Sequence, residues 1–261
     1  MNDWEAKRVL ITVRTYPAPS RQSIEVSCTA GITSEGQWIR LYPIPYRHMP
    51  EDQRFTKYQW VSLSARKASD PRVESYRPNL DTLRIESAPL GNQDAWAAKR
   101  SRVFPLKAPS MCGLQAQRDL TGSPTLGFIK PTIERLEIIP VSAEWTPDQL
   151  AALRQFPLFA TTPSKELEKI PFKFVYHYKC AADGCAGHEM SCTDWEMMQS
   201  WRNWSESYGA SWEAAFRNRY EREMIEKYDT HFYVGTLRAN PNAWIVIGLW
   251  YAPYTAQAQL I

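Results

Sequence analysis

The amino-acid sequence predicts a strand-rich α+β fold. Short segments that alternate between apolar and polar residues recur through the first half of the chain, a spacing typical of a small barrel or a sandwich. One stretch towards the C-terminal end, residues 193–227, instead repeats its large apolar residues every three or four positions, which predicts a helical insertion. A chain of 261 residues has the length of one large domain or two small ones.

The predicted strands are runs of β-branched and aromatic residues between turn signals. In the second of them, Ile24, Val26 and Cys28 fall on one face, whereas Glu25 and Ser27 fall on the other. The strands predicted in this way cover residues 7–15, 23–32, 37–42, 58–66, 132–141, 172–178, 230–236 and 243–250.

Helices are predicted where the apolar period lengthens and a capping residue precedes it. Ser110 and Thr146 are the expected caps of two short helices, over residues 110–119 and 147–155. A further helix is expected over residues 94–102. In the long helical region, the aromatic stripe that starts at Trp195 and resumes at Trp212 is interpreted as packing into the core.

Composition excludes several classes of protein. With 44% hydrophobic and 23% charged residues, the chain is not intrinsically disordered. No stretch approaches the roughly 18 apolar residues of a transmembrane helix, and the first ten residues lack the apolar centre of a signal peptide. Five cysteines, an odd number, are typical of a reducing compartment. We therefore expect a cytoplasmic protein with no membrane partner.

Charge is distributed unevenly along the chain. Residues 1–130 hold 19 Lys and Arg against 12 Asp and Glu, and residues 131–261 hold 12 against 16. A basic half indicates a polyanionic partner, and uneven surface charge without such a partner is the alternative. We divide the chain accordingly into a basic, β-rich half that faces nucleic acid, residues 1–130, and an α+β half, residues 131–261. The two halves could equally form one compact unit.

A cluster of cysteine and histidine residues lies between the predicted strand at 172–178 and the long helix. Thiolate and imidazole are the ligands that zinc favours, and four of them close a structural site. The alternative is that the thiols are small buried residues and that the histidine caps the next helix. The candidate zinc ligands are Cys180, Cys185, His188 and Cys192.

Arginines, aromatic residues and rigid prolines are interleaved between residues 14 and 77. Basic groups for phosphates and aromatic rings for bases are what a single-stranded nucleic-acid groove requires. We expect the aromatic side chains to stack on bases and the basic ones to hold phosphates. The candidate residues are Arg14, Tyr16, Trp38, Arg40, Tyr42, Tyr46, Arg47, Lys57, Arg72 and Arg77.

Two carboxylates stand out from their surroundings. Glu25 is a lone acid in an apolar strand; it either points to solvent or, if it is buried near Arg14 or Arg40, becomes a candidate catalytic group. Asp194 follows Thr193, which with Glu196 has the spacing of a capping box. The alternative places Asp194 at the mouth of a cleft, where it polarises a water.

Several catalytic motifs are absent from the sequence. It contains no Gly-rich phosphate loop, no His-Glu-x-x-His, no Gly-x-Ser-x-Gly and no zinc-deaminase signature. The sequence also lacks a dense acidic cluster of the kind that forms a two-metal nuclease site.

The runs AGI…WIRLYPIPYR and FTKYQWVSLSARKASDPRVESYRP resemble a bacterial family of phage-defence loci, as do CAGHEMSCTDWE and HFYVGT…PNAWIVIGL. The resemblance extends over nearly the whole chain. It implies two OB-like barrels in one chain, a fold that presents a strand face and loops to oligonucleotides. The association with phage defence also implies similarity to antiphage DNA glycosylases, which excise a modified base from phage DNA.

These resemblances imply two alternative functions. The first is a DNA glycosylase that flips a modified base out of phage DNA and hydrolyses its N-glycosidic bond with one carboxylate and no metal. Glu25, Asp194 and Asp229 are the candidate carboxylates. The second is a non-catalytic OB-like adaptor or sensor that binds single-stranded or modified nucleic acid. In both, DNA is the expected partner and a structural zinc is the one expected cofactor.

Overall fold

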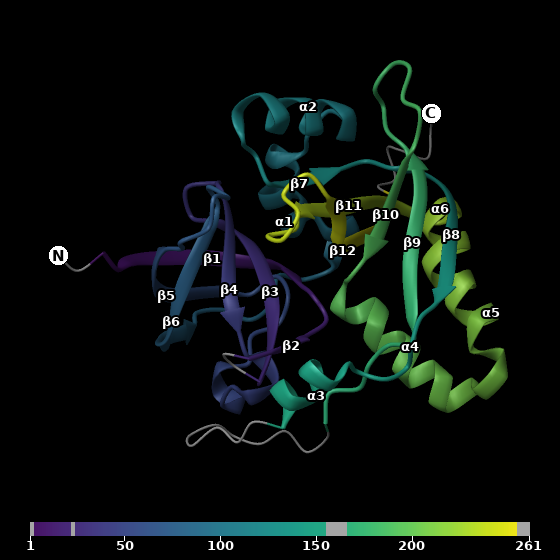
Figure 1. The fold of residues 1–261 in the computed structure, drawn as a ribbon. Coiled ribbons are helices and arrows are strands. Elements are labelled where there is room, and N and C mark those ends of the chain that lie inside the picture. The colour runs from purple at the N-terminus through teal and green to yellow at the C-terminus, as the bar shows by residue number, and fades with distance from the viewer. Residues whose placement is uncertain (1–2, 22–23, 155–165, 255–261) are drawn as a thin grey trace. The chain divides into compact units, whose positions relative to one another are not determined.

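The fold is described from a computed structural model that covers residues 3–21, 24–154 and 166–254 (Figure 1). The chain folds into two compact units, each made of two separate segments. Unit 1 comprises Met1–Pro89 and Pro140–Phe172, and unit 2 comprises Leu90–Ile139 and Lys173–Ile261. Ser23 and Gln155, the predicted ends of one strand and one helix, lie outside the described residues.

Unit 1 is built on a barrel. Its strands pair in the closed order β1-β5-β6-β4-β3-β1, with β2 added at the edge of β3. The pairing of β4 with β6 is parallel, whereas the others in the circuit are antiparallel. This is the circuit of an OB-type barrel of five strands. The strands are β1 (Glu5–Arg14), β2 (Ala18–Ser20), β3 (Ile24–Thr33), β4 (Trp38–Ile44), β5 (Trp60–Lys67) and β6 (Ser75–Ile85).

The barrel closes where β1 and β3 approach each other, and a glycine permits that approach. Gly31 pairs with Ile11, and a Cβ on Gly31 would lie 2.4 Å from the carbonyl oxygen of Leu10. Any larger side chain at this position would therefore push the two strands apart. The connection from β4 to β5 carries two short turns, η1 (Tyr46–His48) and η2 (Glu51–Gln53), and contributes Met49 and Phe55 to the core.

Unit 2 combines a six-stranded sheet with helices. The strands are β7 (Leu126–Ile129), β8 (Thr132–Pro140), β9 (Phe172–Lys179), β10 (His188–Cys192), β11 (Tyr228–Thr236) and β12 (Trp244–Pro253). The helical elements are α1 (Gln93–Val103), η3 (Phe104–Leu106), α2 (Met111–Thr121), α4 (Trp195–Tyr208), η4 (Gly209–Ser211), α5 (Trp212–Arg217), η5 (Asn218–Arg222) and α6 (Glu223–Glu226). The remaining helix, α3 (Pro147–Leu153), belongs to unit 1.

The sheet of unit 2 follows the same circuit as the barrel of unit 1. Its order is β7-β11-β12-β10-β9-β8, and the two outer strands, β7 and β8, are separated along the chain only by Lys130 and Pro131. If β7 and β8 are counted as one interrupted first strand, the strand order becomes the closed order of an OB-type barrel. The pairing of β10 with β12 is parallel, as is the equivalent pairing of β4 with β6.

The insertion between β10 and β11 is helical, as its periodicity predicts. Trp201, Phe216, Tyr220 and Met224 are buried, so the stripe packs into the core. The break near Gly209 is also present, because this residue has a φ of +50°. Both predicted caps are confirmed: Ser110 caps α2, and Thr146 forms a capping box with Gln149 at α3.

The predicted strand-rich α+β class, with small barrels and a helical insertion, is confirmed. The folding units differ from a division after residue 130, because unit 1 takes in residues 140–172 and unit 2 begins at Leu90. Counted by unit, Lys and Arg against Asp and Glu are 16 to 14 in unit 1 and 15 to 14 in unit 2. The charge asymmetry along the sequence therefore does not distinguish the two units.

Within the described ranges, no helix combines the length and the apolar character that crossing a bilayer requires.

Candidate metal centre

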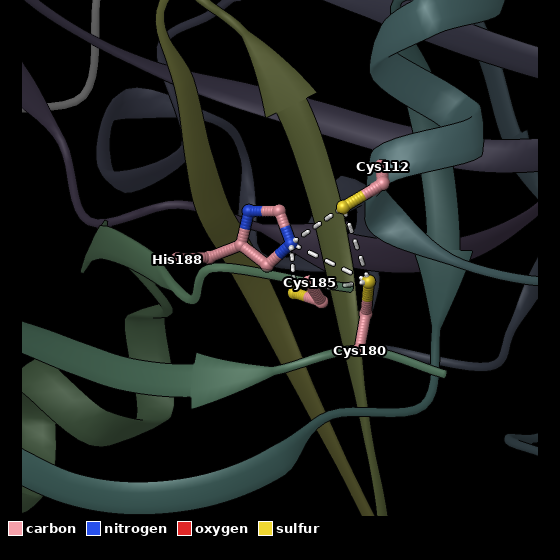
Figure 2. A group of neighbouring side chains, drawn as sticks. All are labelled: Cys112, Cys180, Cys185 and His188. Atoms are coloured by element: carbon pink, nitrogen blue, oxygen red, sulfur yellow. Dashed lines mark hydrogen bonds between the residues drawn. The ribbon is translucent and has the colours of Figure 1, made fainter. Parts of the chain in front are cut away.

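Three sulfur atoms and one imidazole nitrogen converge in unit 2 (Figure 2). The ligand atoms of Cys112, Cys180, Cys185 and His188 all lie within 4.8 Å of one another. Among the residues described in the structure, these four side chains form a group that could hold a metal ion.

The distances between the donors fit a tetrahedral cation. Sγ of Cys180 lies 3.5 Å from Sγ of Cys112 and 3.6 Å from Sγ of Cys185. Nε2 of His188 lies 3.4 Å from the sulfurs of Cys180 and Cys185. Bonds of about 2.3 Å to sulfur and about 2.0 Å to nitrogen, at tetrahedral angles, place such donors roughly 3.5–3.8 Å apart. The four groups are therefore arranged around a space of the size of a metal ion.

Local structure brings three of the donors together in one hairpin. Cys180 follows β9 directly, and His188 opens β10, where it pairs with Tyr178. The turn between Cys180 and His188 contains two residues with positive φ, Gly184 at +69° and Gly187 at +106°. Glycine adopts such backbone conformations readily. This turn folds Cys185 back towards the ends of both strands.

The fourth donor comes from α2, which is fixed against the sheet. Cys112 lies in the first turn of this helix, after the cap in which Ser110 Oγ accepts a hydrogen bond from the N–H of Gly113. Met111 and Leu114 are buried, and Leu114 packs where Gly127 of β7 leaves room for it. The helix therefore holds Cys112 over the β9–β10 hairpin.

The electrostatics favour a thiolate at the centre of the cluster. Burial raises the pKa of Cys180, but backbone N–H groups of Cys112 and Ala182 and the ring of His188 outweigh it and lower the pKa to about 6. Burial and the neighbouring thiols Cys180 and Cys185 raise the pKa of Cys112 to about 12. Without a cation, ionisation of a second thiol in the cluster is therefore unfavourable. A bound cation would favour the thiolate form of all three cysteines.

Cys192 is not part of this cluster, which corrects the predicted ligand set. It lies at the end of β10, buried, and pairs with Phe174 and Val246. An extended strand advances about 3.3 Å per residue, so four residues carry Cys192 far from His188. Cys112 takes its place, although 68 residues separate it from Cys180.

Glu25 is buried, with 2% of its surface exposed, so the interpretation that it points to solvent is wrong. Its Oε2 accepts a hydrogen bond from Arg47 at 3.1 Å and lies 3.8 Å from Nε2 of His48. Its Oε1 has no hydrogen-bond partner among the residues that the structure describes. The carboxylate is therefore paired with η1, not with Arg14 or Arg40.

Asp194 has a structural role in unit 2. It is the N-cap of α4, and its Oδ1 accepts a hydrogen bond from the N–H of Met197 at 3.1 Å. Its Oδ2 accepts one from the N–H of Leu249 on β12, also at 3.1 Å. The capping residue is therefore Asp194 rather than Thr193. A carboxylate so engaged and 1% exposed does not stand at the mouth of a cleft.

Asp229 is held in an ion cluster at the start of β11. It pairs with Arg100 at 2.8 Å and with Lys130, and it lies 3.7 Å from Nδ1 of His231. Burial raises the pKa of Asp229, but Lys130, His231 and Arg100 together hold it below its usual value. The three candidate carboxylates thus have separate partners.

Several predicted nucleic-acid residues of unit 1 have partners within the fold. Arg14 stacks on Tyr46 at 4.0 Å, and Arg47 pairs with Glu25. Arg72 makes a bidentate pair with Asp70 at 2.9 and 2.6 Å. The hydroxyl of Tyr16 donates to the carbonyl of Glu168. These side chains stabilise the barrel and its loops.

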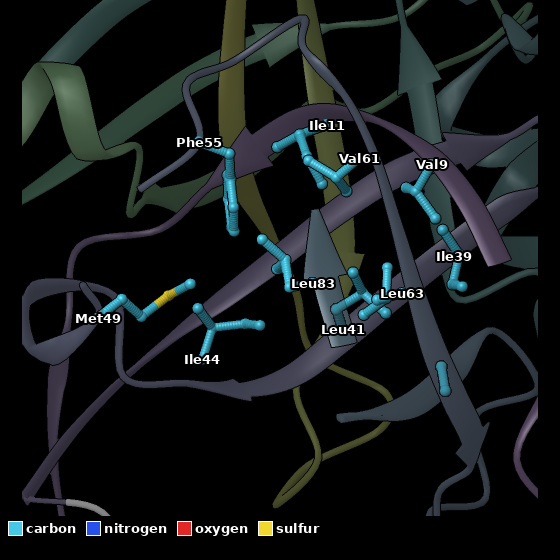
Figure 3. Packing of buried hydrophobic residues seen from close by; sticks show 11 residues of the cluster. Val9, Ile11, Ile39, Leu41, Ile44, Met49, Phe55, Val61, Leu63 and Leu83 are labelled. Carbon is cyan, nitrogen blue, oxygen red and sulfur yellow. The ribbon is translucent and has the colours of Figure 1, made fainter. Parts of the chain in front are cut away.

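Arg40 is also buried, on the side of β4 that faces away from the barrel core. Ile39 and Leu41 point into the core (Figure 3), so the side chain between them leaves the barrel on the other side. It is 2% exposed, and its guanidinium donates to Ser75 Oγ. Its cross-strand neighbour Ala30 is buried as well.

Other predicted residues remain at the surface. Tyr42 is 38% exposed, Trp38 and Lys57 are half-buried, and Arg77 is exposed. Arg77 lines an open pocket together with Trp4 and Arg66, neither of which was predicted as a site residue. The β5–β6 register could have identified Arg66, but the sequence pattern predicts no strand over residues 75–85.

Comparison with known proteins identifies families rather than an activity. Residues 107–261 match the family described as domain of unknown function DUF8757, and residues 5–105 match domain of unknown function DUF8758. A search of curated proteins finds no match. The first of these matches spans more than half of the chain, and the protein therefore belongs to the DUF8757 family.

Proposed function

We propose that the protein binds nucleic acid through unit 1 and that a structural Zn²⁺ stabilises unit 2. The observation that carries the first part is an arginine wall on the barrel, formed by Arg8, Arg66, Arg77 and Arg84. Val61, Leu63 and Ala65 of β5 belong to the core, so Ser62, Ser64 and Arg66 lie on its outer side. Arg8 and Arg84 flank Ser62, and Arg77 pairs with Arg66.

The arginine wall has little negative charge of its own. Arg8 pairs with Glu86 at 2.6 Å, and Arg84 donates to backbone carbonyls of Asp81 and Leu83. Within the described part of the chain, Arg66 and Arg77 have no carboxylate partner. A surface of this kind attracts a polyanion, and neutralising phosphates releases the counterions that drive nucleic-acid binding.

The usual ligand face of an OB barrel is less suited to this role here. That face is formed by the second and third strands of the circuit, β3 and β4. Ala30, Ile32 and Arg40, on the outer side of these strands, are all buried. The exposed cations of the barrel lie instead on β1, β5 and β6, so we assign binding to the arginine wall.

For the metal, the donor set supports Zn²⁺ in a structural role. Three thiolates and one imidazole match its preference, and four protein ligands leave no open position for a substrate. The ion would tie α2 to the β9–β10 hairpin through Cys112. We assign the cluster to stability rather than to chemistry.

Binding can be tested by fluorescence anisotropy with labelled single-stranded and duplex oligonucleotides at low salt. The wild type should bind, and Arg77→Glu/Arg84→Glu should weaken binding by at least about tenfold. Arg154→Glu is the matched control, because Arg154 is an exposed residue of unit 1 outside the wall. Equal loss in the control and in the wall variant, or no binding by the wild type, would contradict the proposal.

A second candidate function is hydrolysis of the N-glycosidic bond of a modified base in phage DNA. The observation in its favour is Glu25, a buried carboxylate whose Oε1 accepts no hydrogen bond from the described part of the chain. A substrate that enters beside Arg47 would meet an acceptor ready to activate water. Incubation with modified phage DNA followed by alkali should then produce strand cleavage that Glu25→Gln abolishes. Cleavage that persists in this variant, or none by the wild type, excludes Glu25 as the catalyst.

A further inference from the structure

One pocket of unit 1 opens at the end of the arginine wall. It has a volume of about 400 Å³ and combines two cations, one indole ring and three proline rings. All of its lining residues belong to unit 1. They are Trp4, Pro43, Pro45, Arg66, Arg77, Pro78, Asn79 and Leu80.

The two cations of this pocket face each other across a strand pair. Arg66 of β5 pairs directly with Arg77 of β6 in antiparallel register. Directly opposed side chains have Cβ atoms about 5 Å apart, and like charges at that distance destabilise a sheet. An anion placed between the two guanidinium groups would remove this repulsion. Arginine is also the side chain best suited to bidentate binding of a phosphate.

The pocket also offers flat apolar surface beside the cations. The indole of Trp4 lies under the guanidinium of Arg66, with 5.0 Å from Cζ to the ring centroid. Pro43 and Pro78 line the same space with rigid rings. Aromatic rings stack on nucleobases irrespective of sequence, because every base has a π face. Anion-binding groups and a stacking surface thus lie within one pocket.

We propose that this pocket holds one nucleotide of a single-stranded nucleic acid, with Arg66 and Arg77 on its phosphate and Trp4 against its base. The assignment rests on the proposed function and names the part of the arginine wall that selects the ligand. A base can enter such a pocket only when it is unstacked, which a single strand permits and an intact duplex resists. The phosphate contact is common to DNA and RNA.

The test is fluorescence anisotropy with labelled oligonucleotides of about 15 nucleotides, as single-stranded DNA, as single-stranded RNA and as a DNA duplex. Both single strands should bind more tightly than the duplex. Arg66→Ala/Arg77→Ala should weaken single-strand binding at least about tenfold for DNA and RNA alike. Trp4→Ala should weaken it about fivefold or more, because it removes the stacking surface.

Arg154→Ala is the matched control, since Arg154 is an exposed residue of unit 1 outside both the wall and the pocket. The affinity of this variant should change less than about twofold. The double variant should fold with unchanged or higher thermal stability, because it removes an opposed like-charge pair. If the wild type binds but the double variant binds equally well, the pocket assignment fails and the proposed function stands. If the duplex or heparin binds more tightly than a single strand, the nucleotide assignment is overturned. If the wild type binds no nucleic acid, both proposals fail.

Discussion

Sγ of Cys112 lies 3.5 Å from Nε2 of His188, although 76 residues separate them in the chain. The contact joins α2 to the start of β10, across the connection that contains β7, β8 and β9. Held by one cation, this contact would close a long loop of the chain. Structural zinc contributes to folding in this way, because the unfolded chain has no preformed site.

The first prediction concerns which cysteine is a ligand. Wild-type protein purified with zinc present should hold about one Zn²⁺ per chain, by elemental analysis. Cys112→Ser should lose most of this metal and some thermal stability. Cys192→Ser is the control, because Cys192 is buried in β10 outside the cluster, and it should retain the metal. Retention in Cys112→Ser together with loss in Cys192→Ser would restore the ligand set that the sequence suggested.

The second prediction concerns the cap of α4. Asp194→Ala removes the acceptor for Met197 and leaves the buried N–H of Leu249 without its partner. The free energy of unfolding should fall by about 2–4 kcal/mol, measured by urea denaturation. Asp148→Ala is the comparison, because Asp148 lies in the first turn of α3 with 79% of its side chain exposed. It should change stability by less than about 0.5 kcal/mol. Similar losses in both variants would show that burial of Asp194 does not matter.

The third prediction concerns acid stability. His231 stacks on Phe128, and burial lowers its pKa to about 4, which Asp229 opposes only in part. The unfolded chain therefore binds more protons than the folded one between about pH 6.5 and pH 4. The contribution of His231 to stability should be constant above this window and fall on acidification within it, with a limiting slope of about 1.4 kcal/mol per pH unit. The Asp229 carboxyl, whose pKa is lowered, loses its contribution only at lower pH.

His231→Phe isolates this effect, because it keeps a ring in the same stack but cannot titrate. Its stability should vary less with pH over the window, whatever its stability at neutral pH. Phe128→Leu is the opposite control: it loses the ring contact yet retains His231, so the slope should persist. A wild-type slope unchanged in His231→Phe would assign acid sensitivity to other groups.

Alternation and periodicity in the sequence predict most of the fold. The helical insertion and eight strands occur where the patterns place them; the strands are β1, β3, β4, β5, β8, β9, β11 and β12. The missing strand of the barrel, β6, contains Pro78 and several polar residues, so its pattern is weak. This segment can be recognised as a strand only from its pairing with β4 and β5, and that pairing exists only in the folded chain.

The site was predicted less completely, for a related reason. Cys180, Cys185 and His188 lie close in sequence and belong to one hairpin, so spacing reveals them. Packing of α2 brings Cys112 to the cluster, and no other candidate ligand lies near Cys112 in the sequence to indicate its role. Arg40 and Arg72 are residues of the type expected on a nucleic-acid-binding surface. However, Arg40 is buried, and Arg72 forms an ion pair with Asp70. Composition indicates which groups are present, whereas tertiary structure determines which of them remain exposed.

The central claim is that the arginine wall binds phosphates, and the salt dependence of binding tests it most directly. The association constant of the wild type for a single-stranded oligonucleotide should be measured over a series of salt concentrations. One phosphate held by Arg66 and Arg77 predicts a slope of log K against log salt of about −0.7, and further phosphates on Arg8 and Arg84 make the slope steeper. A slope near zero, or no measurable association at low salt, would contradict the account.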